Sequence, residues 1–318
     1  MPIGIVDLRR MAIARSLFPP TTLARALQKL GFVQADPIRA PARTQDLTLR
    51  HRVKGYRAGD LERRYQALDI EEEVLVNYGF VTRSVGASMH PRRKLSAWAA
   101  TRRKEARSLL EFVRTRGAVH PREVDEHFAR GSVKNYWGGS SSATTHLLDA
   151  MHYRGMLRVV RRERGIRIYA AQGQALAARD AAARRATIDA LVDVVVSTYA
   201  PLPGASLSRL VGRLRHAVPQ WAGELKFGLK RARQRLSHAQ VKGVDWYWPS
   251  TERPVNDAPE DAVRLLSPFD PVVWDRQRFE LFWGWPYRFE APAAEDQSIR
   301  SRIVEMPIPA PMHWVARP

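Results

Sequence analysis

Residues 120–171 constrain the fold most, because their pattern changes from helix to hairpin at short intervals. "HPREVDEHF" (120–128) predicts a short helix entered by a proline, and a Gly/Ser-rich turn then leads into a helix that ends at Gly155. Two apolar-alternating runs follow, "MLRVVRRE" and "IRIYAA", joined by a basic turn. Helix, turn, helix and hairpin in this order are typical of a winged helix, with residues 144–153 as its recognition helix.

The rest of the sequence predicts mostly helices, with short strands between them. Helical spacing indicates segments at residues 5–16, 22–31, 58–68, 90–117 and 178–200. Further helices and a strand follow to residue 248 and could form another winged helix. We therefore expect a mainly α fold with small β wings, an α+β class. The expected parts are a first winged-helix-like domain with a long helix at 1–115, a second winged helix at 116–177, a third winged-helix-like domain at 178–250, and a β-rich C-terminal region with an irregular tail at 251–318.

Local signals indicate where several helices begin or end. Thr21 or Thr22 can cap a helix that ends at Gly31, and Ser206 can cap the helix that follows Pro201. The acidic run "EEEV" (71–74) is interpreted as a solvated helix face.

The charge of the chain points to a polyanionic partner. Lys and Arg number 52 against 32 Asp and Glu, a net charge of +20, and 44 of the basic residues are Arg, whose planar guanidinium matches phosphate oxygens. There is no Cys, which excludes disulfides and thiolate metal sites. The N-terminus has no signal-peptide pattern and no apolar run is long enough to span a membrane. We expect a cytoplasmic DNA-binding protein, monomeric and without an obligate protein partner.

Familiar catalytic motifs are missing from the sequence. No phosphate-binding glycine loop, zinc-binding HExxH or GxSxG elbow is present, and the nine His are scattered. Asp270 and Asp275 in "SPFDPVVWDR" could act as paired carboxylates, but a rigid turn closed by an Asx bond from Asp270 explains the prolines better. "NYWGGSSS" (135–142) fits a phosphate-binding nest and a plain turn equally well.

The segment "GFVQADPIRAPAR" (31–43) offers the best candidate catalytic pair. Pro37 disfavours a helical conformation for Asp36, and in an extended segment Gln34 and Asp36 share one face while Val33 and Ala35 point into the core. An amide and a carboxylate placed in this way can hold a water, which the amide orients and the carboxylate activates. A simple Asp-Pro turn is the alternative. Basic residues that could bring DNA phosphates to this face are Arg39, Arg43, Arg50, His51, Arg52 and Lys54 behind it and Arg161, Arg162, Arg164 and Arg167 on the wing.

Several stretches together resemble the YcaQ/AlkZ-type DNA glycosylases, which repair bulky alkylation damage and interstrand crosslinks. They are "FVQADPIRAPARTQDLTLRHRV", "NYGF" with "MHPRR", the block ending in "RIYAA", and "LLSPFDPVVWDRQRFELFWGWPYRFE". The resemblance implies tandem winged helices, a small β-rich C-terminal region, and monofunctional hydrolysis at N7-alkylguanine without metal or cofactor. "QAD" resembles the QxD branch, in which Gln34 would orient water and Asp36 would activate it or stabilise the sugar cation.

The sequence departs from this family at two places. After "YRFE" the usual tyrosine-rich strand and hairpin are replaced by another sequence, so the resemblance is expected to end near residue 290 in a truncated or altered tail. The stretch "NYGFVTRSV" lacks the His-bearing segment of some members, and no catalytic role is carried over there.

A non-catalytic winged-helix regulator or architectural protein is the rival interpretation. It predicts tight, sequence-selective binding to undamaged DNA without base excision, with Gln34 and Asp36 buried or locked in a turn rather than facing DNA. In either case, binding should weaken steeply as salt rises.

Overall fold

One order of elements, helix–strand–helix–helix–hairpin, occurs three times in the structure. The computed structural model describes residues 2–36, 42–92, 98–128, 131–134, 140–173, 180–254 and 264–287. In each repeat the last strand of the hairpin lies in the middle of a three-stranded sheet and pairs with the first strand, which gives the sheet orders β1-β3-β2, β4-β8-β7 and β10-β11-β9. This is the winged-helix arrangement, and the predicted α+β class is confirmed.

The first unit contains α2 (Leu23–Leu30), β1 (Phe32–Gln34), α3 (Thr44–Arg50), α4 (Asp60–Arg63), a 3-10 turn (Tyr65–Ala67), β2 (Ile70–Val74), β3 (Tyr78–Thr82) and α5 (Arg83–Met89). The second unit contains α6 (Ala100–Arg116), β4 (Ala118–Val119), α7 (Pro121–Phe128), β5 (Ser132–Lys134), β6 (Ser140–Ser142), α8 (Ala143–Tyr153), β7 (Leu157–Glu163) and β8 (Ile166–Ala171). The third unit contains α9 (Ala181–Tyr199), β9 (Leu202–Pro203), α10 (Gly204–Arg213), two 3-10 turns (Leu214–His216 and Pro219–Glu224), α11 (Leu225–Arg235), β10 (Ser237–Val241) and β11 (Val244–Trp248). Outside the units lie α1 (Ile5–Ser16) and α12 (Arg276–Trp283).

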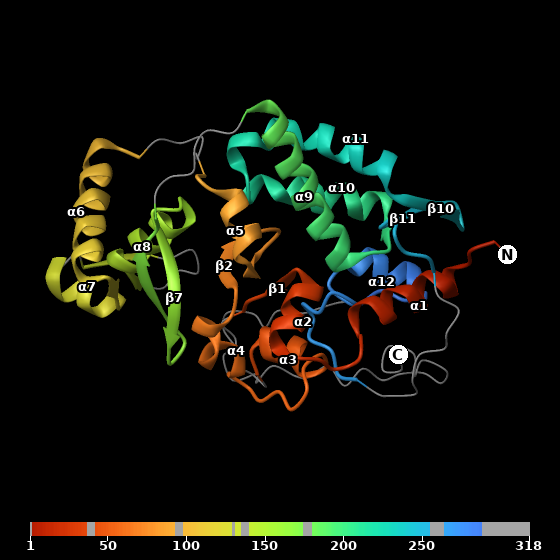
Figure 1. Cartoon of the computed structure of the whole chain (residues 1–318), viewed down its shortest axis with the longest axis horizontal. Helices are drawn as coiled ribbons and strands as arrows, with labels where there is room; N and C mark the ends of the chain where they lie inside the picture. Colours follow the sequence, from red (N-terminus) through yellow and green to blue (C-terminus); the bar gives the residue numbers. More distant parts are fainter. Residues whose placement is uncertain are drawn as a thin grey trace.

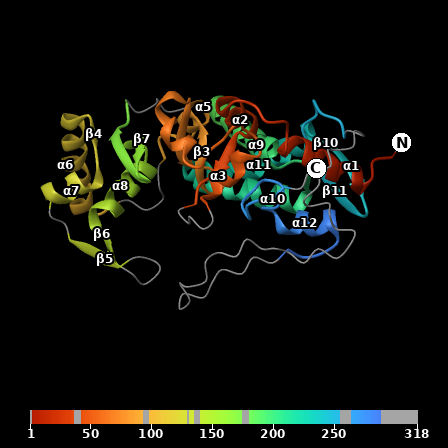
Figure 2. The same ribbon diagram turned by 90° about the horizontal axis from the view of Figure 1, so that it is seen from below.

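The first and third units form one body, and the second unit forms a separate lobe. Buried residues of β1 and β3 and of α9, α10 and α11 belong to a single apolar cluster, which also takes in Phe282 of α12. The second unit has its own cluster, formed by α6, α7, α8 and the β7–β8 hairpin. Both views show this lobe to one side of the body, and Figure 1 shows it next to β2 (Figure 1; Figure 2). The arrangement sets the first unit between the other two.

Several predicted helix ends are confirmed, because they depend on local chemistry. The Thr22 side chain accepts a hydrogen bond from the Arg25 backbone N–H and caps α2, and Gly31 ends α2 with φ of 71°. The second-unit hairpin turns at Arg164 and Gly165, both with positive φ. Ser206 is different: it is buried inside α10, which already begins at Gly204 after Pro203.

The acidic run at 71–74 is not a solvated helix face, and that prediction is wrong. It forms strand β2, paired with β3 along its whole length. Glu71, Glu72 and Glu73 are all buried. Each has a basic partner from a distant segment, so the charges that suggested solvent exposure are neutralised inside the protein.

The predicted helix at 90–117 begins only at Ala100 and packs with the second unit rather than the first. Residues 90–92 are not helical, because Pro91 favours the extended conformation that His90 adopts. Arg92 is buried, and its guanidinium donates to the carbonyls of Val74, Tyr153 and Ala217. Residues 93–97 lie outside the described part.

The C-terminal region is not β-rich over residues 264–287, where the structure has turns and helix α12. The Asp275 side chain caps α12 by accepting from the Arg278 backbone N–H, and Phe279 packs with Ile13 of α1 and with Leu17, which directly follows α1. A helical amphipathic face therefore accounts for aromatic residues that looked strand-like. Residues 288–318 lie outside the described residues.

Candidate active site

Strand β1 presents its side chains alternately to two sides, as predicted. Val33 and Ala35 pack into the apolar core of the first unit, and Phe32 packs on the other side against the core shared with the third unit. Gln34 lies opposite Gly79 of β3 in the antiparallel ladder. A Cβ atom at Gly79 would come within 2.3 Å of the Val33 carbonyl oxygen, so only glycine allows this close pairing beside Gln34.

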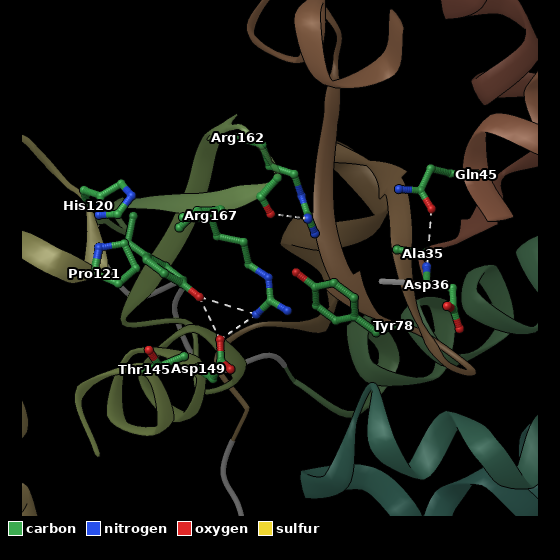
Figure 3. Close-up of a pocket in the computed structure, with 13 residues that line it drawn as sticks. Ala35, Asp36, Gln45, Tyr78, His120, Pro121, Thr145, Asp149, Arg162 and Arg167 are labelled. Atoms are coloured by element: carbon green, nitrogen blue, oxygen red, sulfur yellow. Dashed lines mark hydrogen bonds and ion pairs between the residues drawn. The ribbon is translucent and has the colours of Figure 1, made fainter. Parts of the chain in front are cut away.

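Asp36 lines a pocket between the first unit and the lobe formed by the second. The pocket has a volume of about 440 Å³. The first unit contributes Ala35, Asp36, Gln45 and Tyr78; the second contributes His120, Pro121, Thr145, Asp149, Arg162, Gly165, Ile166, Arg167 and Tyr169. Figure 3 shows Ala35, Asp36 and Gln45 on one side of Tyr78 and the residues of the lobe on the other. Gln34 does not line this pocket, although Asp36, two residues later, does.

The wall of the pocket is an ion-pair network centred on Glu72. This carboxylate is fully buried and accepts from Nε and Nη2 of Arg162, at 2.7 and 2.6 Å, and from the Tyr78 hydroxyl at 2.6 Å. Burial opposes its charge, but the hydrogen bonds and charge of Arg162 lower the pKa of Glu72 overall. Burial raises the pKa of Tyr78 far above its usual value, so the phenol is a neutral donor. The network fixes the lobe against the first unit.

Arg167 completes this wall. Its guanidinium lies 4.6 Å from the centre of the Tyr78 ring, and its Nη1 donates to Asp149 at 2.5 Å. One face of Tyr78 is therefore covered by a cation from the wing (Figure 3).

The amide of Gln34 is held by residues from other parts of the chain. Its Oε1 accepts from Asn77 Nδ2 at 2.8 Å and from Trp274 Nε1 at 3.1 Å. Among the residues that the structure describes, none accepts a hydrogen bond from Gln34 Nε2. The Gln34 side chain therefore offers another molecule its NH2 group, which can donate a hydrogen bond.

Asp36 is fixed through its main chain, since its backbone N–H donates to Gln45 Oε1 at 3.3 Å. The structure thus places Gln34 and Asp36 on one extended segment with separate supports. A water shared between them stays a prediction.

The predicted phosphate contacts behind this segment have different surroundings. Arg50 and Lys54 are exposed, whereas Arg43 forms an ion pair with Glu62. The His51 ring is hydrogen-bonded to the Leu265 carbonyl, and burial lowers its pKa. Arg39 lies outside the described residues.

Arg52 cannot be the surface phosphate contact that was expected. It is fully buried and forms a two-pronged ion pair with Asp270, at 2.8 and 2.9 Å. The Asp270 carboxylate also accepts from the Val272 backbone N–H, which confirms the predicted Asx turn. Asp275, the other carboxylate of this stretch, caps α12 and pairs with Arg209, so neither Asp is part of a catalytic pair.

On the wing, Arg164 is exposed at the hairpin turn and Arg161 pairs with Glu163. Arg162 instead points back to Glu72 and is mostly buried, because it supports the pocket wall. DNA contacts by Arg161 and Arg164 stay predictions.

The part of the chain that the structure describes offers neither a metal site nor a membrane-spanning helix. No group of three His, Asp or Glu side chains there could hold a metal ion. None of the helices described is long and apolar enough to cross a bilayer.

Comparison with known proteins identifies the family of this chain. A family model described as "DNA glycosylase AlkZ-like" matches residues 27–311. The chain belongs to the AlkZ-like DNA glycosylase family. It is therefore a DNA N-glycosylase, and DNA is its substrate. The matched range includes residues 291–311, so the resemblance extends beyond residue 290, where the sequence analysis placed its end.

The fold of this glycosylase is similar to that of a solved relative, the DNA glycosylase AlkZ of Streptomyces sahachiroi. The TM-score is 0.57 and the sequence identity 13%, over 85% of this chain and 77% of that one. At this identity the likeness concerns the fold. No curated protein sequence matches the chain.

The sequence analysis missed the residues that support the site. Asn77 and Trp274 lie in "NYGF" and "SPFDPVVWDR", stretches chosen for resemblance and not for chemistry. The structural role of Glu72 was not predicted, because the run 71–74 was interpreted as a solvated helix face. The apolar residues that flank the run in "DIEEEVLV" were the available sign of a buried strand.

Proposed function

We propose that this glycosylase hydrolyses the N-glycosidic bond of alkylated purines, N7-alkylguanine above all, and unhooks interstrand crosslinks formed at that position. One observation carries the proposal. Asp36 lines the pocket between the first unit and the lobe, while Gln34, two residues earlier, has its carbonyl oxygen occupied and an NH2 group left to donate. We propose that the Gln34 amide and the Asp36 carboxylate hold one water between them at the edge of this pocket.

The proposed reaction needs little help with the leaving group. A guanine alkylated at N7 is cationic, so when the C1′–N9 bond breaks its electron pair passes into the ring and neutralises the charge. The water oxygen forms the new bond to C1′, and its proton passes to the Asp36 carboxylate. Before that transfer, the negative charge of Asp36 also stabilises the oxocarbenium-like sugar.

Gln34 has a narrower role in this scheme than the sequence alone suggested. Because Asn77 and Trp274 both donate to its Oε1, Gln34 holds the water by donating from Nε2. The water then accepts one hydrogen bond from Gln34 and donates one to Asp36, which leaves a lone pair for C1′.

We assign the chain to the QxD branch, because its motif resembles that branch in having Asp at position 36. Exposed Arg50, Lys54 and Arg164 contact DNA phosphates, consistent with the net charge of +20. The enzyme acts as a cytoplasmic monomer without metal or cofactor.

Base release from a duplex with a single N7-methylguanine tests the proposal. In single-turnover reactions at saturating enzyme, Asp36→Asn and Gln34→Ala are each expected to slow release by about 10²- to 10⁴-fold. A matched control is Asp69→Asn, since Asp69 is an exposed carboxylate of the same unit whose ion pair with Arg83 spans 3.7 Å. It should release base at the wild-type rate.

A duplex crosslinked through two N7 positions tests the second part, with strand separation on a denaturing gel as the readout. Base release without separation would limit the enzyme to single adducts. Equal rates for Asp36→Asn and wild type would refute the catalytic role.

The rival interpretation, a non-catalytic regulator, is set aside because the chain belongs to an enzyme family.

A further inference from the structure

Three residues from distant parts of the chain converge on the amide of Gln34. Asn77 lies between β2 and β3, Arg213 ends α10 of the third unit, and Trp274 precedes α12. Asn77 and Trp274 donate to Gln34 Oε1 at 2.8 and 3.1 Å, and Arg213 Nη1 donates to Asn77 Oδ1 at 3.0 Å. Gln34 is thus bonded directly to the first unit and to the C-terminal segment, and Arg213 of the third unit is linked to it through Asn77.

The chemistry of these donors fixes which way both amides face. An indole N–H can only donate, so the atom of Gln34 facing Trp274 must be the carbonyl oxygen. A guanidinium can only donate too, so Arg213 must face the Asn77 carbonyl oxygen, which turns the Asn77 NH2 toward Gln34. Two one-way donors thus exclude the flipped orientation of each amide.

The donors are themselves held in place. The Arg213 guanidinium lies 5.3 Å from the centre of the Trp274 ring, and that ring packs against Tyr199 at 5.3 Å between centroids. The Trp274 backbone N–H donates to the Asp270 carbonyl at 2.8 Å. Asp270 is in turn anchored by buried Arg52. The indole N–H is therefore preset before DNA binds.

This arrangement has two consequences for Gln34. Without the donors, its last torsion has two roughly equivalent orientations, one of which would present a carbonyl oxygen in place of the NH2. The positive charge of Arg213 also polarises the hydrogen-bond chain through Asn77, which strengthens the N–H donors at the far end.

We propose that Asn77, Trp274 and Arg213 are positioning residues that set the Gln34 NH2 group to donate to the attacking water. This inference rests on the proposed function, in which Gln34 holds that water. None of the three touches the reacting atoms in this scheme; they act through Gln34.

Two variants test it, each removing one hydrogen-bond donor to Gln34 Oε1. Asn77→Leu and Trp274→Phe are expected to slow single-turnover base release from N7-methylguanine by about tenfold each, with the affinity for the same duplex within twofold of wild type. Trp248→Phe is the matched control. Trp248 Nε1 also donates one hydrogen bond, at 3.2 Å, but its acceptor is the Glu252 carbonyl and not Gln34. This substitution should leave the rate unchanged.

The decisive experiment measures base release again with both substitutions made in the Gln34→Ala protein. Residues that act only through Gln34 have no further effect there, so the tenfold losses should vanish. If Asn77→Leu and Trp274→Phe each still slow release tenfold in that background, they act by another route and the positioning role is wrong while the proposed function stands.

A readout without catalysis separates this inference from the proposed function. In ¹⁵N-labelled protein, the Gln34 side-chain NH2 should give two sharp proton signals, and both variants should broaden them or speed their exchange with water. Unchanged signals would overturn the positioning role. Sharp signals in wild type together with no base release would instead overturn the proposed function.

Discussion

The buried ion pair between Arg52 and Asp270 should be one of the most costly contacts in the protein to break. Both side chains are fully buried. Arg52 makes four hydrogen bonds, two to Asp270 and one each to the carbonyls of Ser16 and Thr48. The pair ties the turn before α12 to the first unit, and so supports the segment that carries Trp274. The perturbation is Asp270→Asn, which keeps the shape but removes the negative charge.

The expected loss of stability follows from the buried charge that the substitution leaves without a partner. Removing one partner of a buried pair costs about 3–5 kcal/mol, because the other charge stays buried without compensation. Two of the four Arg52 hydrogen bonds go to carbonyls and survive, and Asn keeps one acceptor oxygen, so we expect about 3 kcal/mol for Asp270→Asn. Arg52→Met should cost a similar amount, since it leaves a buried carboxylate.

Urea unfolding followed by tryptophan fluorescence measures these costs, and a double-mutant cycle measures the coupling. The double variant Arg52→Met/Asp270→Leu replaces the pair by apolar groups and should cost clearly less than Arg52→Met and Asp270→Leu added together. Additive costs, or a loss below about 1 kcal/mol for Asp270→Asn, would refute the reasoning, since either result means that the pair is hydrated rather than buried.

Two further predictions concern the first unit. Gly79→Ala would place a Cβ within 2.3 Å of the Val33 carbonyl oxygen, so β1 and β3 must separate. We expect the free energy of unfolding, measured by thermal unfolding, to fall by about 1–3 kcal/mol and base release to slow. The control is Gly212→Ala in α10, where a Cβ meets open space, and it should not lower the stability of the protein. A Gly79→Ala protein as stable as wild type would show that β1 and β3 have room for a Cβ at position 79. Burial alone would raise the pKa of Glu73, but Arg92 and other partners bring it down to about 2 from 4.5. The resulting stabilisation, about 3 kcal/mol, should be complete above pH 4.5 and be lost as the pH falls toward 2, and Glu73→Gln should flatten that part of the stability profile. A wild-type profile that is already flat there would contradict this.

The parts of the fold that could be predicted from sequence depend on near neighbours. The α2 cap at Thr22, its end at Gly31 and the turn at Arg164 and Gly165 are decided by a few consecutive residues. The order of helices and hairpin in the second unit followed from such signals. These interactions form within a few residues, so their pattern can be read along the chain.

The errors arose where distant partners changed the meaning of a residue type. Three glutamates predict solvent exposure, yet β2 is buried because arginines from β7 and from the segment after α5 neutralise it. Arg52 looked like a phosphate contact until Asp270, 218 residues away, was found beside it. The aromatic residues of α12 looked strand-like because the apolar surface of α1 that they cover is not visible in the sequence.

The sequence by itself determined the chemistry available at the candidate site: an amide and a carboxylate, two residues apart on an extended segment before a proline, in a strongly basic chain. Alternation along β1 was enough to send Val33 and Ala35 into the core. Only the tertiary structure decided which end of the Gln34 amide is left to donate, because its carbonyl oxygen is bound by Asn77 and Trp274. Likewise, the pocket beside Asp36 exists only because the lobe is bound to β2 through Arg162 and Glu72. Hydrogen-bond direction and burial depend on partners far away in sequence, and those partners are brought together only by folding.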